Sequence, residues 1–298
     1  MEIIPYEAEL APEVARLYNR AVSGLPHCHP VATERLARFL AREPEEASND
    51  IPSDEVVFVA MADGQGIGFV DTTVGHPGGW GDGTQGVVRF LCYVPGRRAA
   101  GQALLEAAEA HLARKDLDRI QAFPQEHCYP FYHLHAAYLS DRLGHVEGLL
   151  GMGGYERVRG EVILDWPGFR PAVPPPPEAS ARTDVTFPEA GGELPGVEVR
   201  AWLDGDDVGE CVCRSCGEYA PDAEAQRWVE VVGLGVEDNL RGRGWGRYLL
   251  LRALGEARET GYRNAAISTW WGNHRALLFY SNYGFRVADW TYGWGREL

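Results

Sequence analysis

The residues best suited to chemistry are a glycine- and arginine-rich turn, Arg241-Gly-Arg-Gly-Trp-Gly246, and the segments on either side of it. Residues 229–236 form a short, mostly apolar run, which is typical of a buried strand. Residues 248–257 repeat leucine and alanine at helical spacing. Glycines let a ligand approach the backbone closely, and a turn that opens a helix aims several N–H groups and the positive end of the helix dipole at one point. With its arginines, the turn predicts a binding site for a diphosphate.

Two other glycine-rich phosphate loops do not fit this turn. The nucleotide-binding P-loop ends in Gly-Lys-Ser/Thr, and the turn carries no lysine. The dinucleotide fingerprint is Gly-x-Gly-x-x-Gly, whereas the turn reads Arg-x-x-Gly-x-Gly. It resembles the acetyl-CoA loop of the GNAT N-acetyltransferase superfamily, Gln/Arg-x-x-Gly-x-Gly/Ala between a strand and a helix. Further on, Asn273-His-Arg-Ala276, Tyr280 and Gly284-Phe285 resemble that family's Asn-x-x-Ala…Leu-Tyr-x-x-x-Gly-Phe ending.

The resemblance implies acetyl-CoA as co-substrate. In this family the fourth strand splays from the fifth and leaves backbone donors and acceptors for the pantetheine arm. Here that backbone would be Leu234, Gly235 and Val236, whose amides would also polarise the thioester carbonyl. Asn273 would contact the CoA arm, although an N-cap role is by itself a complete structural explanation. The diphosphate would be held by Arg241, Gly242, Arg243, Gly244, Trp245, Gly246 and Arg247.

Two side chains are predicted to move protons. Glu230 stands eleven positions before Arg241, as the base glutamate of histone-acetylating members stands before their loop, and strict alternation gives it the same side-chain parity as Leu234. A carboxylate facing a partly dry cleft has a raised pKa, which suits a general base; the alternative is a solvated glutamate paired with an arginine. Tyr280 takes the family's general-acid position; the alternative is a core tyrosine. Further candidate bases are Glu210, Glu218 and Asp222.

The strand–loop–helix pattern occurs a second time, at Arg98-Ala-Ala-Gly101-Gln-Ala103, which indicates a tandem of two GNAT-like modules. The first copy is degenerate, because two alanines stand in its loop, Leu150 takes the tyrosine position, and valines stand where the base would be. Residues 124–142 are an insertion rich in aromatic residues, interpreted either as a helix packed over the sheet or as a plug of the first module's cleft. The chemistry is therefore predicted in the second module.

We expect an α/β (α+β) fold of two GNAT-like modules, each a mixed twisted β-sheet with a splayed central strand pair and flanking helices. The prolines at residues 174–177 favour an extended linker. The predicted boundaries are 1–165 for the degenerate module, 166–183 for the linker and 184–298 for the module with the acetyl-CoA site. The second module is expected to lack the family's opening strand and two helices. The wall of its acceptor cleft would then come from the first module or from a second chain in a homodimer.

The composition of the chain indicates which classes of binding partner are expected. The formal net charge of −15 disfavours nucleic acid and anionic membranes and favours a cationic substrate. There is no signal-peptide pattern and no apolar run of about twenty residues, so a soluble cytoplasmic protein is expected. Cys211, Cys213 and Cys216 resemble half a zinc site, but tetrahedral zinc needs a fourth ligand, and no metal is expected.

The sequence thus predicts an acetyl-CoA-dependent N-acetyltransferase that transfers the acetyl group directly to a primary amine of a small molecule or a peptide. The alternative is a non-catalytic acyl-CoA-binding or scaffold protein, in which Glu230 and Tyr280 are relics.

Overall fold

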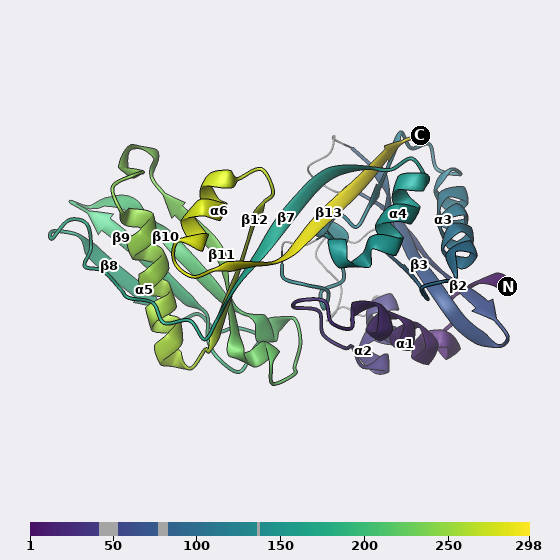
Figure 1. Cartoon of the computed structure of the whole chain (residues 1–298), viewed down its shortest axis with the longest axis horizontal. Coiled ribbons are helices and arrows are strands. Elements are labelled where there is room, and N and C mark those ends of the chain that lie inside the picture. The colour runs from purple at the N-terminus through teal and green to yellow at the C-terminus, as the bar shows by residue number, and fades with distance from the viewer. Residues whose placement is uncertain (42–52, 77–82, 136–137) are drawn as a thin grey trace. The chain divides into compact units, whose positions relative to one another are not determined.

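A computed structural model of the chain describes residues 1–41, 53–76, 83–135 and 138–298. The chain divides into two compact units, the first made of Met1–Glu161 and Asp289–Leu298 and the second of Val162–Ala288. Each unit has a mixed β-sheet with helices packed against it (Figure 1), which confirms the predicted α/β architecture. Within the described ranges, no helix is long and apolar enough to cross a membrane.

The first unit is built around an antiparallel run of strands: β1 (Glu2–Pro5), β2 (Ser53–Ala62), β3 (Gln65–Gly75) and β4 (Gln85–Tyr93). Parallel to β4 lies β5 (Arg119–Ala122), followed by β13 (Arg286–Glu297), which also pairs with the short β6 (Leu139–Ser140), and then by β7 (Glu156–Pro167). The helices are α1 (Ala11–Val22), α2 (Thr33–Leu40), α3 (Arg98–Leu112) and α4 (Gly144–Met152).

Amphipathic sequences explain how the helices of the first unit pack. The apolar face of α1 buries Val14, Leu17 and Tyr18, and the helix contacts β3 and β4. In α3, Leu104 and Ala108 are fully buried, and the helix contacts β2, β3 and β4. Figure 1 shows α1 and α3 on either side of the β2–β3 hairpin. The sheet is therefore covered on both sides.

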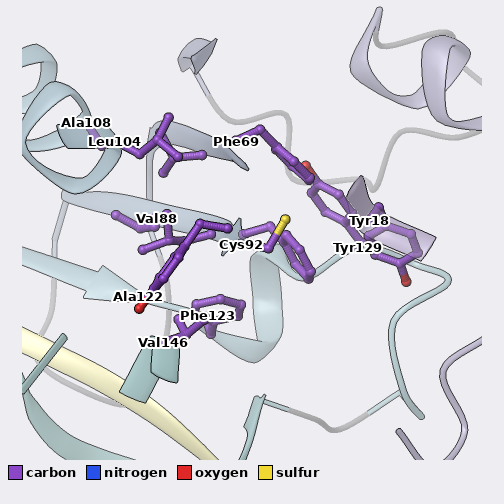
Figure 2. Close-up of a cluster of buried hydrophobic side chains, with 14 of the residues drawn as sticks. Tyr18, Phe69, Val88, Cys92, Leu104, Ala108, Ala122, Phe123, Tyr129 and Val146 are labelled. Atoms are coloured by element: carbon purple, nitrogen blue, oxygen red, sulfur yellow. The ribbon is translucent and has the colours of Figure 1, made fainter. Parts of the chain in front are cut away.

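Aromatic rings form the centre of the core of the first unit. The Phe90 ring lies 5.3 Å from the ring of Tyr18, 5.6 Å from Phe69 and 5.2 Å from Tyr129, measured between centroids. Figure 2 shows Tyr18 and Tyr129 beside one another in this cluster. Such tilted and stacked pairs contribute about 0.5–1.5 kcal/mol each beyond the area that they bury.

The aromatic insertion supplies part of this core without forming the predicted helix. Its described residues contain only the short 3-10 helices Gln125–His127 and Asp141–Leu143 and the strand β6. Tyr129, Phe131 and Tyr132 are nevertheless buried, and the Tyr18 hydroxyl donates a hydrogen bond to the Phe131 carbonyl at 3.0 Å. The aromatic residues were correctly read as core, but their spacing does not produce a helix.

The second unit contains β8 (Arg182–Thr186), β9 (Val197–Leu203), β10 (Asp206–Ser215) and β11 (Trp228–Val236), all antiparallel neighbours. β12 (Asn264–Trp270) joins β11 in parallel, and β7 is the next strand on the other side of β12. Figure 1 shows α5 (Trp245–Thr260) lying across β9, β10 and β11, and α6 (His274–Ser281) after β12.

The second unit differs from expectation at its start. β8 pairs with β9 as β1 pairs with β2, so the opening strand is present; the described residues 162–244 contain no α-helix. The proline-rich segment packs along α5 rather than standing free, since a Cβ added to Gly255 would lie 2.8 Å from Val173. Glycine at position 255 permits this close approach.

The division into units also differs from the predicted boundaries. Residues 289–298 were assigned to the second module, but they belong to the first unit. Their strand partner is β5, with Trp294 opposite Ala122 and Arg296 opposite Ile120. A pairing between segments so far apart in the chain leaves no local signal in the sequence.

Candidate active site

The parallel strands β11 and β12 separate part-way along their length. They pair from Trp228 with Asn264 to Val231 with Ile267. β11 then continues to Val236 and β12 to Trp270, and no pairing between these described segments follows. β11 therefore ends in five residues whose outer edge has no strand partner on the β12 side.

The backbone direction at this edge follows from one hydrogen bond. The N–H of Glu237 donates to the Val208 carbonyl on the β10 side at 3.0 Å. Alternate residues of an antiparallel strand direct their N–H groups to opposite sides. The N–H groups of Leu234 and Val236 are therefore directed to the unpaired edge, where an extended ligand could pair with them.

The loop after β11 is shaped by two glycines. Gly242 has φ of +78°, and Gly244, the N-cap of α5, has φ of +94°. Both values lie in the left-handed region that glycine adopts without steric cost. A Cβ added to Gly244 would meet only Pro177, at 3.7 Å. The loop therefore leaves open space in front of the helix.

The first turn of α5 presents backbone donors to this space. The first intrahelical bond runs from the Tyr248 N–H to the Gly244 carbonyl at 3.0 Å, so the N–H groups of Gly246 and Arg247 precede the helical ladder. Arg241 fixes the loop, because its Nε donates to the Val236 carbonyl at 3.1 Å and its Nη2 lies 2.7 Å from Asp238. Donors and a helix start of this kind suit an anionic group.

α6 closes the other side of the site. The Asn273 side chain accepts a hydrogen bond from the Ala276 N–H at 3.1 Å, which confirms the predicted N-cap, and donates to Thr269 Oγ1 at 3.2 Å. Tyr280 is buried on the same helix, and its burial, followed by the nearby Cys211, raises the pKa of the phenol. A phenol with a raised pKa keeps its proton at neutral pH and can donate it.

These elements line one open cavity of about 530 Å³. Ten of the thirteen predicted site residues line it, which leaves out Glu230, Arg243 and Trp245. Trp245 is buried in the core, 6.1 Å from the Tyr248 ring, so only its backbone could serve a ligand. Among the described lining residues there are three arginines and no carboxylate. The full lining is Leu234, Gly235, Val236, Arg241, Gly242, Gly244, Gly246, Arg247, Asn273, Arg275, Ala276, Phe279, Tyr280 and Tyr283.

Four lining residues were missed by sequence reasoning: Arg275, Ala276, Phe279 and Tyr283. All four belong to α6 or to the turn that follows it. Positions 276, 279, 280 and 283 repeat at three- and four-residue spacing, so they share one helix face. That periodicity around Tyr280 was the available signal.

Glu230 does not lie where alternation along the strand places it. Glu230 pairs with Arg214, whereas Leu234 pairs with Cys211, and positions 211 and 214 are on opposite faces of β10. The register shifts between Val212 and Cys213, so β11 carries a bulge that reverses its parity. The prediction that Glu230 and Leu234 share a face is therefore wrong.

Glu230 is fully buried and hydrogen-bonded to a tyrosine. The Tyr219 hydroxyl donates to Glu230 Oε2 at 2.7 Å, and Tyr219 itself is only partly buried. Burial, followed by the neighbouring Glu230, raises the pKa of Tyr219. Tyr219 is therefore the less buried member of this hydrogen-bonded pair.

The other candidate bases also lie outside the cavity lining. Glu210 forms an ion pair with Arg200, and Asp222 Oδ1 accepts hydrogen bonds from two backbone N–H groups of the following turn. Burial raises the pKa of Glu218, against the effect of nearby Arg214. Cys211, Cys213 and Cys216 are buried free thiols, and no described group of three His, Cys, Asp or Glu side chains could hold a metal ion.

The corresponding region of the first unit has a different form. Gly101 lies inside α3 rather than in a loop, because the segment between β4 and α3 is only residues 94–97, against 237–244 in the second unit. The Tyr93 ring occupies the space beside Gly101, where an added Cβ would lie 2.5 Å from it. The Tyr93 hydroxyl donates to the His145 carbonyl at 2.7 Å. The sequence match at Arg98 therefore does not produce a phosphate loop.

A buried charge cluster lies where β4 bulges. Asp71 pairs with Phe90 and Thr72 with Val88, which leaves Arg89 in the bulge, as Val232 is in β11. Arg89 Nη1 lies 2.6 Å from Glu55 Oε1 and 3.3 Å from Asp71 Oδ2. Arg89 is thus held in the first unit by one carboxylate from β2 and one from β3.

Comparison with known proteins identifies the pattern. The sequence profile of the Acetyltransferase (GNAT) family matches residues 164–285. No curated protein sequence matches the chain significantly.

Solved structures extend the likeness to the whole chain. A tandem GNAT protein from the clavulanic acid biosynthesis pathway superposes with a TM-score of 0.65 at 17% identity, over 99% of this chain and 98% of that one. A GCN5-related N-acetyltransferase from Sphaerobacter thermophilus gives 0.63 at 18% identity, over 99% and 95%. The glucosamine N-acetyltransferase region of a fungal GH3 β-N-acetylglucosaminidase gives 0.68 at 14% identity, over 99% and 38%. At these identities the likeness is one of fold.

Proposed function

We propose that the chain, whose residues 164–285 match the sequence profile of the acetyltransferase (GNAT) family, is a tandem member of that family, and that its second unit transfers the acetyl group of acetyl-CoA to a primary amine. The acceptor class is a small molecule or a peptide. The first unit takes no part in the chemistry, because its segment before α3 is too short to form the loop and Leu150 stands at the position of Tyr280.

One observation carries the proposal. The unpaired edge of β11, the glycine-shaped loop and Tyr280 all line a single open cavity of about 530 Å³. The diphosphate of acetyl-CoA needs an anion site, and the pantetheine arm needs an extended backbone as its partner. The thioester needs a proton donor. The cavity offers the three along one path from the loop to α6.

The residues fit acetyl-CoA in charge as well as in shape. Arg247 and Arg275 line the cavity, and none of its described lining residues is a carboxylate, although the chain has a net charge of −15. The backbone donors of Gly246 and Arg247 would bind the diphosphate, and those of Leu234 and Val236 would bind the pantetheine arm and polarise the thioester carbonyl. Holding both substrates in this geometry supplies much of the acceleration.

The proton transfers follow from the two tyrosines. The acceptor arrives as an ammonium and must lose a proton before its nitrogen attacks the carbonyl carbon. In the proposed route that proton passes to the Tyr219 oxygen while the Tyr219 proton passes to Glu230, 2.7 Å away. The C–S bond then breaks and the departing thiolate takes its proton from Tyr280. The acylated nitrogen loses its second proton to the Tyr280 oxygen, so the product amide is neutral and the phenol is restored.

The test is titration of acetyl-CoA against the full chain, followed by an assay of CoA thiol release with a panel of primary amines. The Gly244→Trp variant fills the open space before α5 and is expected to abolish binding. Gly205→Trp is the matched control, since Gly205 has φ of +96° in the open β9–β10 turn. The proposal fails if Gly244→Trp binds acetyl-CoA like the wild type, or if no amine releases thiol.

The alternative function is a non-catalytic acyl-CoA-binding protein. The observation that favours it is that Glu230 does not line the cavity. Glu230→Gln and Tyr219→Phe distinguish the two functions. An enzyme loses turnover in both variants and keeps its acetyl-CoA affinity, whereas a binder shows no transfer in the wild type and normal affinity throughout.

A further inference from the structure

A second cavity, of about 350 Å³, lies within the first unit. Its walls come from the C-terminal half of α1, the end of β4 and the start of α4. This volume is at the lower end of the range of roughly 300–1,000 Å³ that is typical of small-molecule sites. The lining is Leu17, Arg20, Ala21, Ser23, Gly24, Leu25, Cys92, Tyr93, Val94, Pro95, Arg142, Leu143 and His145.

The charge of this lining is opposite to that of the chain. It contains two arginines and one histidine, and none of its described residues is acidic, although the chain carries 43 acidic against 28 basic residues. A neighbouring cavity of about 310 Å³ shares Tyr93, Pro95 and His145 and adds Arg98, again without a carboxylate. A concave surface with positive charge in an acidic protein concentrates anions.

Two arginines belong to the lining of this cavity. Arg20 lies in the last turn of α1. Arg142 Nη1 donates to the Gly24 carbonyl, just beyond that helix, at 3.2 Å, and its Nε lies 3.8 Å from the buried Asp289. These contacts hold Arg142 at the rim, with its side chain 48% exposed.

The remaining walls set the size and character of a ligand. Leu25 and Leu143 are buried apolar side chains of the lining. Tyr93 closes one side, because its ring lies against Gly101 and its hydroxyl is bonded to the His145 carbonyl. A molecule as long as CoA would have to displace Tyr93, whereas a short one would not.

We propose that this cavity is a second ligand site, which takes a small organic anion, a carboxylate or a phosphate monoester carried on an apolar body. The arginine pair would bind the anionic group, and the leucine walls would contact the apolar part. The site does not depend on acetyl transfer in the second unit, so the two proposals can fail separately.

The experiment titrates benzoate and phenyl phosphate against the full chain at low ionic strength by calorimetry. Benzamide, the neutral counterpart of benzoate, is the matched ligand control. One site per chain is expected for at least one anion, with benzamide bound at least about tenfold more weakly because the charge-assisted hydrogen bonds are lost. Comparing benzoate with phenyl phosphate shows whether the group is a carboxylate or a phosphate.

Substitutions in each unit show whether the anion binds in the cavity of the first unit. Arg20→Gln and Arg142→Gln remove one charge each and are expected to weaken binding about tenfold, while Gly244→Trp in the second unit leaves it unchanged. The proposal is overturned if neither anion binds, if benzamide binds equally well, or if Gly244→Trp abolishes binding. Arg142 also contacts Gly24 and Asp289, so Arg142→Gln could fail to fold. In that case the anion affinity of Arg20→Gln, on the exposed side of α1, is the test of the proposal.

Discussion

Tyr280 combines the properties that a proton donor at a thioester site requires. It lines the cavity of the second unit, it is only 8% exposed, and its burial raises the pKa of the phenol, which therefore stays protonated at neutral pH. Its ring is held between Phe279 and Phe285, at centroid distances of 5.3 and 5.9 Å. The aromatic neighbours keep the ring in place when the hydroxyl is removed.

Tyr280→Phe is therefore expected to lower kcat by roughly 10²–10⁴-fold, the range for loss of a general acid, and to leave the affinity for acetyl-CoA unchanged. Stopped-flow detection of the released thiol measures the first quantity and calorimetry the second. Tyr248→Phe, which removes a hydroxyl bonded to Thr183 outside the cavity, is the control and should keep its kcat. Equal rates for Tyr280→Phe and the wild type would rule out the acid role.

Asp289 is expected to make the stability of the first unit depend on pH. It is buried in the first unit, where Ser140 Oγ donates to its Oδ2 at 2.7 Å and His133 Nε2 lies 3.8 Å away. Burial raises the pKa of Asp289 to about 7, whereas burial lowers the pKa of His133 to about 3, so the histidine supplies no charge. The folded state therefore holds a proton on Asp289 that the unfolded chain releases near pH 4.

Because the pKa of Asp289 is higher in the folded than in the unfolded state, the contribution of protonated Asp289 to the free energy of unfolding is fully present below about pH 4. This contribution is lost as the pH rises to about 7. Asp289→Asn keeps an acceptor for Ser140 and removes the titration. Between pH 5 and 7 the variant should gain stability relative to the wild type by at most about 1.4 kcal/mol per pH unit. Urea unfolding at several pH values measures this difference, with Asp116→Asn, at an exposed aspartate, as control. A pH-independent difference would contradict the shift.

At the scale of elements, β11 carries the acyl-donor side of the site. Its bulge at Val232 and its separation from β12 after Val231 occur together, so the strand gives one edge to the β10 ladder and the other to the cavity. The N–H of Val236 is directed away from β10, and that of Gly235 toward it. The two neighbouring residues therefore have different functions.

Substituting proline separates these functions, because proline removes the N–H. Val236→Pro should leave the β10–β11 ladder intact and weaken acetyl-CoA binding about five- to tenfold, as expected for one lost hydrogen bond. Gly235→Pro should instead lower the thermal midpoint by breaking the ladder. Calorimetry and thermal unfolding of both variants provide the comparison. A Val236→Pro variant with wild-type affinity would exclude the edge as a binding partner.

The site was predictable from sequence where its residues are local in the chain. The loop around Gly244, the cap at Asn273 and the helix with Tyr280 each follow from a motif with its own turn or helix chemistry. The position of Glu230 was not predictable, because one extra residue at Val232 reverses the faces of β11. A bulge depends on the partner strand, and alternation along a single strand cannot reveal it.

The structure of the first copy of the motif was also not predictable from its sequence pattern. Arg98 to Gly101 matches the loop pattern, but the segment before α3 has four residues where the second unit has eight, so the helix begins too early for a loop. Composition did predict that the aromatic insertion contributes core, since aromatic residues are buried wherever the backbone permits. It did not predict the Arg89 cluster, which joins β2, β3 and β4.

On the scale of the molecule, the two units share strands. β7 begins in the first unit and ends in the second, whereas β13 begins in the second and ends in the first. Within the first unit, β13 pairs with β5 and contributes the buried Asp289, Thr291 and Trp294. The first unit is therefore built from two separate stretches of chain, whereas the second unit is one continuous stretch.

Deleting residues 289–298 is expected to destabilise the first unit and to leave the acetyl-CoA site of the second in place. Hydrogen exchange should show faster exchange of the amides of β5, whose strand partner is removed, and unchanged protection in α5. Deleting only Leu298, which is 53% exposed, is the control. Unchanged protection of β5 in the larger deletion would contradict the strand assignment.

The path of β13 also imposes an order of events during synthesis. Residues 1–161 leave the ribosome first, but the strand that pairs with β5 is made only after residues 162–288. At roughly 5–20 residues per second, those intervening residues take on the order of ten seconds. During that interval β5 exposes a backbone edge that can pair with another nascent chain. The second unit, by contrast, has most of its sheet available by the time α6 emerges, so we expect the later-made half of this protein to acquire its fold first.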